Sequence, residues 1–302
     1  MRAHLLSVGG RLPSGESAAA VQYFEPNFID EALVLLERYA PNAHVLAGGT
    51  LLGFDIRSGA SEATAIVNVK RIPSLREIAF DGRVLTIGAL ATAHDLARHD
   101  LVKLHAPLVA RAAESVGARQ LRTVATVGGN VCSGHHAADL SVALLASDAV
   151  CLLSDVVSGP EQMSVEEFVQ LDRAARGYRL LTAIEIPQQP AAGAYEKMRT
   201  RRAFEMALVS AAVALHVDGG IVRDARIALG GAAPVPVRAR NAEKSLRGVP
   251  ANEETARAAA QRAARDDAHP ADDPHAGSAY RQHLIEVLTL RALRSAFGQS
   301  AR

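Results

Sequence analysis

Two glycine pairs, each at the end of an apolar run, are the features of the sequence best suited to chemistry. The first is Ala47-Gly48-Gly49-Thr50 and the second is Val127-Gly128-Gly129-Asn130. Because glycine has no side chain, backbone amide N–H groups at both predicted turns can converge on an anion such as a diphosphate. Taken alone, each pair also fits an ordinary tight turn. Further hydrogen-bond donors stand beside the pairs, at Thr50, Thr126, Asn130 and Ser133.

The familiar nucleotide-binding signatures are absent from the sequence. No glycine-rich loop ends in Gly-Lys-Ser or Gly-Lys-Thr, and no Gly-x-Gly-x-x-Gly lies between a predicted strand and helix. The sequence therefore supports neither a P-loop nor a Rossmann cofactor site. Any anion held by the glycine pairs belongs to another architecture.

Composition excludes several classes of partner. The chain has 302 residues, 49% of them apolar, which is enough for one large core or two modest ones. Lys and Arg number 33 against 32 Asp and Glu, so the chain has no net field that attracts nucleic acid or an anionic membrane. Apolar runs such as Leu140–Ala146 are too short to cross a bilayer, and no signal peptide is evident. We expect a cytoplasmic protein that binds neither nucleic acid nor membrane.

The cysteine count bears on metal centres. Only Cys132 and Cys151 are present, and two thiols alone do not ligate an iron–sulfur cluster or a structural zinc. A disulfide between them remains open at this point. Any metal centre that works with this chain must therefore belong to a partner.

The first part of the chain alternates between helical and strand patterns. Apolar residues at Ile29, Leu33, Leu36 and Ala40 predict a helix. The sequences TAHD and SVEE are capping boxes, which predict helices opening at Thr92 and Ser164. A further helix is expected over residues 138–146, and strands are expected over residues 44–50, 64–70, 83–89, 149–153 and 179–186.

A change of pattern near residues 188–194, QQPAAGA, predicts a domain boundary. Beyond it, Leu208–Val217 and Val222–Leu229 flank Asp-Gly-Gly as a predicted hairpin. Two helices rich in Ala and Arg are expected from about Glu253 and Ala276, with HPADDPH as the loop between them. The chain is thus predicted to be α+β throughout.

Five segments, in the same order, give the chain a specific resemblance. They are VLAGGTLLGFDIR, QLRTVATVGGNVCSGHHAADL, RLLTAIEIP, YEKMRTRRAFEMALVSAAVAL and IALGGAAPVPVRAR. From about Tyr23 to Phe297 the chain resembles the FAD-binding medium subunit of molybdenum hydroxylases, the family of xanthine dehydrogenase, carbon monoxide dehydrogenase and hydroxybenzoyl-CoA reductase. The resemblance implies a vanillyl-alcohol-oxidase-type (PCMH-type) FAD-binding domain of two α+β subdomains over residues 1–187. It also implies a C-terminal α+β domain over residues 194–302, with a three-stranded sheet and helices.

The resemblance also implies which residues bind FAD. The two glycine motifs would hold the FAD diphosphate between them, and Asp139 would meet a polar edge of the cofactor. A helix-cap role for Asp139 and a surface position for Lys197 are the structural alternatives. The complete set of implied cofactor-binding residues is Val45, Leu46, Ala47, Gly48, Gly49, Thr50, Leu51, Leu52, Val116, Thr126, Val127, Gly128, Gly129, Asn130, Ser133, Asp139, Leu181 and Lys197.

The resemblance further implies an oxidoreductase role without a catalytic residue of the chain's own, because the flavin performs the redox step. In the family, a molybdopterin-binding large subunit acts on the substrate and a 2Fe-2S small subunit relays electrons. FAD then passes them to NAD+, oxygen or another acceptor. A stand-alone FAD-dependent oxidase or reductase is one alternative, and a partner protein that has lost FAD is another. The intact glycine motifs speak against the latter.

Some positions depart from the family pattern. Many relatives have Asn where Thr123 stands, and Ser-Pro or Asn-Pro-like residues in place of His135 and His136. The adjacent histidines are expected in a polar, exposed loop, with a contact to FAD or a partner as the alternative. Cys132, directly after the second motif, is expected to pack as a small apolar residue. The organic substrate and the residues around the flavin ring do not follow from the sequence.

Overall fold

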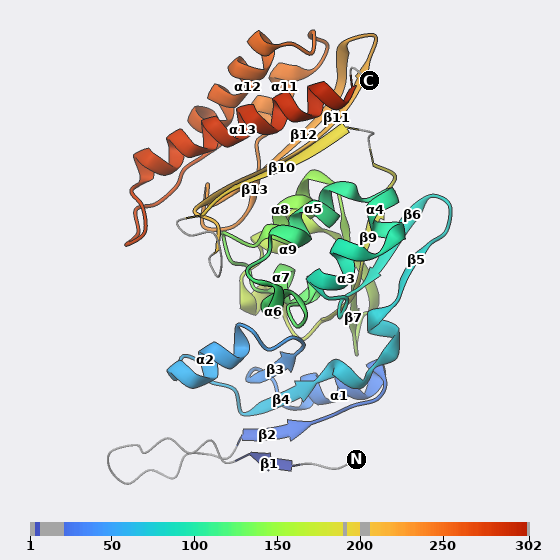
Figure 1. The fold of residues 1–302 in the computed structure, drawn as a ribbon. Coiled ribbons are helices and arrows are strands. Elements are labelled where there is room, and N and C mark those ends of the chain that lie inside the picture. Colours follow the sequence, from blue (N-terminus) through green and yellow to red (C-terminus); the bar gives the residue numbers. More distant parts are fainter. Residues whose placement is uncertain (1–3, 7–20, 190–191, 200–205, 301–302) are drawn as a thin grey trace.

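The computed structural model describes residues 4–6, 21–189, 192–199 and 206–300. Parts of three predicted regions lie outside the described residues. They are residues 1–3 and 7–20 of the expected first domain, residues 190–191 of the predicted domain boundary, and residues 200–205 of the segment YEKMRTRRAFEMALVSAAVAL. Three units follow one another along the molecule, each with its own hydrophobic core (Figure 1).

The first unit is a small sheet with helices beside it, at the bottom of Figure 1. Its strand order is β1-β2-β4-β3, with β2, β3 and β4 parallel and β1 antiparallel. Helix α1 buries Leu33 and Leu36, as the periodicity predicted, and Val67 of the sheet belongs to the same core. The elements are β1 (His4–Leu6), β2 (Val21–Phe24), α1 (Ile29–Arg38), β3 (Ala43–Leu46), α2 (Leu52–Ser58) and β4 (Ala65–Asn68).

The second unit is an antiparallel five-stranded sheet, order β5-β6-β9-β7-β8, covered by helices. Both predicted capping boxes are confirmed, since Thr92 caps α3 and Ser164 caps α9. The strands are β5 (Ile78–Phe80), β6 (Val84–Gly88), β7 (Val150–Asp155), β8 (Gly159–Ser164) and β9 (Leu180–Pro187). The helices are α3 (Ala93–Arg98), α4 (Asp100–His105), α5 (Pro107–Ser115), α6 (Arg119–Arg122), α7 (Val127–Cys132), α8 (Asp139–Ala146), α9 (Val165–Gln170) and α10 (Arg173–Arg176). The short helices η1 (Val69–Arg71) and η2 (Pro73–Arg76), between β4 and β5, bury Val69 and Leu75 in the core of the first unit.

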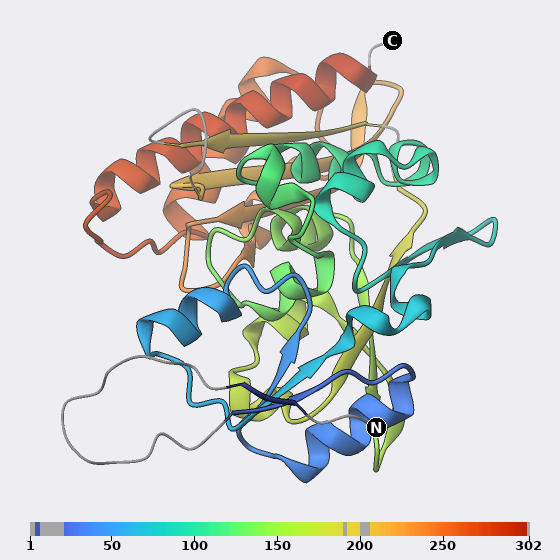
Figure 2. The same cartoon turned by 60° about the horizontal axis from the view of Figure 1, so that its bottom comes forward.

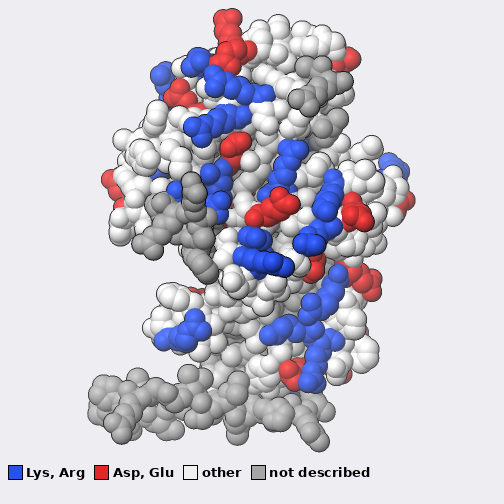
Figure 3. Space-filling view, in the orientation of Figure 1, with Lys and Arg blue, Asp and Glu red and all other residues white. Residues whose placement is uncertain are grey.

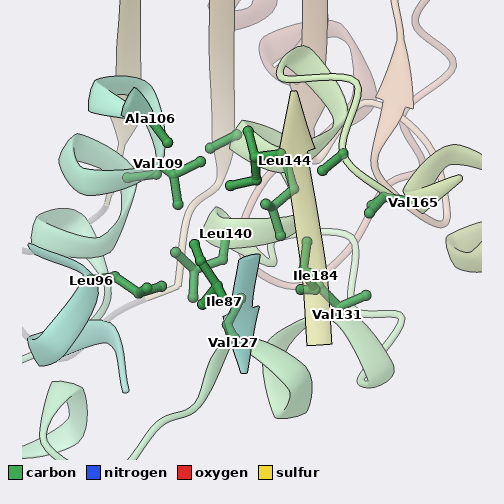
Figure 4. Packing of buried hydrophobic residues seen from close by; sticks show 14 of the residues in the cluster. Ile87, Leu96, Ala106, Val109, Val127, Val131, Leu140, Leu144, Val165 and Ile184 are labelled. Carbon is green, nitrogen blue, oxygen red and sulfur yellow. The ribbon is translucent and has the colours of Figure 1, made fainter. Parts of the chain in front are cut away.

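Helix α8 forms the centre of this unit. All of its residues are buried, because it packs against α5 and α9 on its own unit and against β11 and β12 of the third. A helix that is covered on every side is expected to be mostly apolar, and the polar side chains of α8, Asp139 and Ser141, are buried with hydrogen-bond partners. Figure 4 shows Leu140 and Leu144 of this helix among Val109, Val127 and Ile184.

The third unit packs helices on one face of an antiparallel sheet, with the long helix α13 lying across β10 and β11 (Figures 1 and 2). The predicted hairpin is confirmed, with Gly219 and Gly220 both at positive φ in its turn. Beside the three long strands the sheet has a two-residue fourth strand, β13. The elements are β10 (Ala192–Met198), β11 (Val209–Asp218), β12 (Ile221–Gly230), β13 (Val237–Arg238), α11 (Arg240–Leu246), α12 (Glu253–Asp266) and α13 (Ser278–Ser300).

The surface is charged but mixed in sign. On the face drawn in Figure 3, Lys and Arg side chains run in a band along the molecule, with Asp and Glu side chains between them. Among the described residues, no helix is both long and apolar enough to span a bilayer.

Candidate functional site

A cavity of about 380 Å³ lies where the first glycine motif of unit one faces helices α6, α7 and α8 of unit two. Val45, Ala47 and the loop over residues 48–52 form one wall, and Thr126, Gly129 and Asn130 belong to the other. The two motifs that the sequence analysis singled out therefore share one site, although they are far apart along the chain. Its remaining lining residues are Val116, Gly117, Leu121, Ala125, Cys132, Ser133, His135, Ala137, Ala138, Asp139 and Met206.

A second cavity, of about 580 Å³, continues from the first. The residues that line both cavities are Val45, Ala47, Leu51, Leu52, Gly129, Cys132 and Ser133. The second cavity extends between units one and two as far as α9, α10 and β9, which contribute Phe168, Arg176 and Leu181 among others. Together they form an elongated site of the size that a dinucleotide cofactor requires.

The first glycine motif is a loop between β3 and α2, and each glycine has its own reason to be there. A Cβ atom on Gly48 would lie 2.0 Å from the carbonyl oxygen of Val124, so only glycine lets this loop pack on the second unit. Gly49 has φ = 73°, in the left-handed region that favours glycine. Within the described residues, the amide N–H groups of Gly49, Thr50 and Leu51 donate to no protein acceptor. These amides stand in the cavity wall as free donors.

The second glycine pair is not a turn, and this corrects the sequence prediction. Both glycines lie in the first turn of α7, and Thr126 caps that helix by accepting the Gly129 N–H at 3.1 Å. The Gly128 N–H donates to the carbonyl of Ala89 at 2.9 Å. Gly128 is required because a Cβ atom would come within 2.8 Å of Ala89. These amides are used inside the protein, so the expectation that they converge on an anion is wrong.

The polar side chains in and beside the second motif differ in whether their donor hydrogens already have an acceptor in the protein. The Thr126 hydroxyl serves α7 as an acceptor, which leaves its hydrogen available. Asn130 Oδ1 accepts from Ser141 N at 3.2 Å, and within the described residues its Nδ2 has no acceptor. Ser133, expected to be a free donor, donates to the carbonyl of Asn130 at 2.6 Å and accepts from His135 N at 3.2 Å.

Asp139 does not act as a side-chain cap, because the N-cap position of α8 is Ala138. Its carboxylate is buried, and its two oxygens accept from Tyr195 Oη and Lys197 Nζ, each at 2.6 Å. Lys197 Nζ also donates to the carbonyl of Ser115 at 3.1 Å. Burial raises the pKa of Asp139 and lowers the pKa of Lys197, while the opposite charge of each partner counteracts the shift. This cluster joins α8 to β10 of the third unit.

Most of the predicted site residues line one of the two cavities. The exceptions are Leu46, Val127 and Lys197. Val127 is fully buried in the core of unit two (Figure 4), and Lys197 is buried beside Asp139, which does line the first cavity. Lys197 is therefore not a surface lysine. Its ion pair is with Asp139, and a contact with the cofactor stays a prediction.

Several cavity residues were not predicted. Leu121, a few residues before the second motif, and Met206 line the first cavity, and Phe168 and Arg176 line the second; no local pattern connects the last three to the glycine motifs. His135 also lines the first cavity, and the sequence analysis gave a contact with FAD or a partner only as the alternative to an exposed loop position.

Arg176 is the notable unpredicted residue. Its Nη1 donates to the carbonyl of Cys132 at 2.6 Å and its guanidinium lies 4.9 Å from the centre of the Phe168 ring. Within the described residues it pairs with no carboxylate, and its Nε is buried without a partner. Cys132 itself lines both cavities, and desolvation raises the pKa of its thiol to about 11, so the thiol stays protonated at neutral pH.

The geometry matches known proteins over nearly the whole chain. Residues 19–189 match the model of the FAD-binding domain in molybdopterin dehydrogenase, and residues 193–296 match that of the carbon monoxide dehydrogenase flavoprotein C-terminal domain. The chain is 30% identical to the glyceraldehyde dehydrogenase medium chain of Sulfolobus acidocaldarius, over 90% of this chain and 96% of that one. It is also 30% identical to the putative xanthine dehydrogenase FAD-binding subunit of Escherichia coli, over 85% of this chain and 89% of that one. Carbon monoxide dehydrogenase of Hydrogenophaga pseudoflava superposes with a TM-score of 0.86 at 28% identity, covering 92% of this chain and 97% of that one.

The chain therefore belongs to the flavoprotein subunits of molybdenum-containing dehydrogenases. More closely, it is an FAD-binding medium subunit of the xanthine and carbon monoxide dehydrogenase type, and its enzyme class is oxidoreductase. The site suits the cofactor. The unpaired amides of residues 49–51, with the free hydrogens of Thr126 and Asn130, are all donors, and a diphosphate offers only acceptors.

Proposed function

We propose that this chain is the FAD-carrying member of a heterotrimer with a molybdopterin-binding large subunit and a 2Fe-2S small subunit. It accepts electrons from the iron–sulfur clusters and passes them to NAD+, oxygen or another acceptor. Within the described residues, no group of three or more His, Cys, Asp and Glu is arranged to hold a metal ion, and we propose that the donor cluster belongs to a partner. We also propose that the chain divides into an FAD-binding domain over residues 1–187 and a C-terminal domain over residues 194–302; β9 ends at Pro187 and β10 begins at Ala192.

The observation that carries the proposal is the set of unpaired hydrogen-bond donors in the walls of the first cavity. We propose that the amides of Gly49, Thr50 and Leu51 bind the FAD diphosphate, with the Thr126 hydroxyl and Asn130 Nδ2 on the facing wall. The apolar residues predicted for the site, Val45, Leu52, Val116 and Leu181, line the cavities and would contact the rest of the cofactor. Asp139 holds Lys197 in place next to this site.

When bound, FAD supplies the electron-accepting and electron-donating chemistry, so the chain needs no nucleophile or acid–base pair. The residues of the chain would bind and orient FAD and shield it from water. The buried Asp139–Lys197 pair fixes β10 against α8, and Arg176 holds α7 through the carbonyl of Cys132. Fixed donors of this kind also stabilise negative charge where it accumulates.

The test is purification of the chain, alone and together with candidate large and small subunits. We expect about one FAD per chain, released into the supernatant by acid because it is bound noncovalently, and a native mass that contains all three subunits. Absence of flavin from the well-folded chain would contradict FAD binding. A native mass of this chain alone, together with full substrate turnover by it, would instead support a stand-alone oxidase or reductase.

A further inference from the structure

His135 and His136 are adjacent in the loop between α7 and α8, and the structure gives the two rings different positions. The rings are stacked, with centroids 4.5 Å apart and planes inclined by 26°. His135 lines the first cavity. His136 does not, and the charged groups near it are Arg281 and Asp273 of the third unit.

Two hydrogen bonds fix the orientation and the protonation of His135. Its backbone N–H donates to Ser133 Oγ at 3.2 Å, and its ring Nδ1 accepts the N–H of Ala137 at 3.0 Å. An Nδ1 that accepts carries a lone pair, so the proton of the neutral ring sits on Nε2. Burial lowers the pKa of His135, which keeps the ring neutral at pH 7.

The remaining ring nitrogen therefore presents an N–H donor. Within the described residues, Nε2 of His135 has no acceptor in the protein. The residue shares its cavity with the free amides of residues 49–51, the Thr126 hydroxyl and Asn130 Nδ2, all of which are donors as well. These unpaired donors are best satisfied by the part of the ligand that has the most hydrogen-bond acceptors, which in FAD is the diphosphate.

We propose that His135 is a cofactor-binding residue in this chain, whose Nε2–H donates a hydrogen bond to a diphosphate oxygen of FAD. The inference rests on the proposed location of the FAD site. The bond from the Ala137 N–H to Nδ1 places the ring in advance, so little side-chain freedom is lost on binding.

Two isosteric substitutions separate this role from a purely structural one. His135→Gln places an amide nitrogen close to the Nε2 position and gives up the Nδ1 acceptor. His135→Asn places an oxygen close to the Nδ1 position and gives up the Nε2 donor. His136→Gln is the matched control, because that ring does not line the cavity. Apo forms of the full chain and of each variant are titrated with FAD by flavin fluorescence, with a thermal melt of each apo form.

We expect His135→Gln and His136→Gln to bind FAD within about threefold of wild type, and His135→Asn to bind at least about tenfold more weakly, as for a hydrogen bond to a charged group. ADP, which has the diphosphate without the flavin, should show the same ranking in competition. The reverse ranking, equal losses in both His135 variants, or ADP binding that ignores the substitutions would overturn the proposal. A wild-type chain that melts normally and binds no FAD would instead contradict the proposed function.

Discussion

Gly48→Ala is the substitution that most directly tests how the site is assembled. The added Cβ would lie 2.0 Å from the carbonyl oxygen of Val124, where an ordinary carbon–oxygen contact is about 3.3 Å, so the two segments must separate by about 1.3 Å. Neither can swing aside, because the Cβ position is fixed by the backbone of residue 48 and the Val124 oxygen is itself a backbone atom. Overpacking of this kind costs about 1–3 kcal/mol. The separation also moves the amides of residues 49–51 away from the facing wall, for which we expect at least about tenfold weaker FAD binding, or about 1.4 kcal/mol.

The assay compares FAD affinity and the thermal midpoint of apo chains. Gly53→Ala is the matched control, since it lies in α2 a few residues away and its nearest neighbour would be Arg57 Nη1 at 3.9 Å. In a helix that change is neutral or stabilising by up to about 1 kcal/mol. Gly48→Ala is expected to lower the midpoint by roughly 2–4 °C per kcal/mol, with Gly53→Ala at or above wild type. Wild-type affinity and midpoint in Gly48→Ala would refute the account of the loop.

Three further predictions concern neighbouring parts of the site. Asp139→Ala leaves Lys197 buried without its partner and should destabilise the chain by about 3 kcal/mol in urea unfolding, with part of the loss recovered when Lys197 is also replaced by Met. Burial lowers the pKa of His135 and His136, so below about pH 6.5 the unfolded chain binds more protons than the folded chain, and stability should fall as the pH drops. Replacing both histidines with Phe should make the thermal midpoint change less between pH 7 and pH 5 than it does in the wild type. Thr126→Ala removes the cap of α7 and should cost about 1 kcal/mol in the same melts, together with a loss of FAD affinity; an unchanged midpoint would argue against the cap.

The elements that the sequence predicted best are those fixed by local hydrogen bonds. Thr92 and Ser164 each exchange hydrogen bonds with a residue three positions on, so four residues suffice to predict where the helix begins. The hairpin turn is likewise determined locally, because Gly219 and Gly220 readily adopt the positive φ angles that the turn requires. In contrast, α7 was missed because its glycines favour a turn, and it is the contact of Gly128 with Ala89 and the cap from Thr126 that stabilise it as a helix.

The candidate site was predictable where a motif is continuous and unpredictable where distant segments meet. Asp139 and Lys197 were both assigned to the cofactor, yet nothing local shows that residues 58 positions apart make one ion pair. The same holds for Arg176, which reaches Cys132 from a separate helix, and for Met206. Such contacts depend on how the sheets and helices pack, which the spacing of residue types does not encode.

The two glycine motifs work as one assembly rather than as two equivalent phosphate turns. Gly48 permits the loop to touch Val124, and that contact sets the loop beside the segment that leads to Thr126 and α7. Gly128 brings α7 onto Ala89 in the same way. Three of the four glycines, counting the positive φ of Gly49, are thus explained by backbone geometry within the protein, whereas the amides of residues 49–51 in the first motif are available to an anion. An intact glycine motif in a related chain is therefore evidence that the cavity walls meet, and FAD binding then depends on the donors those walls present.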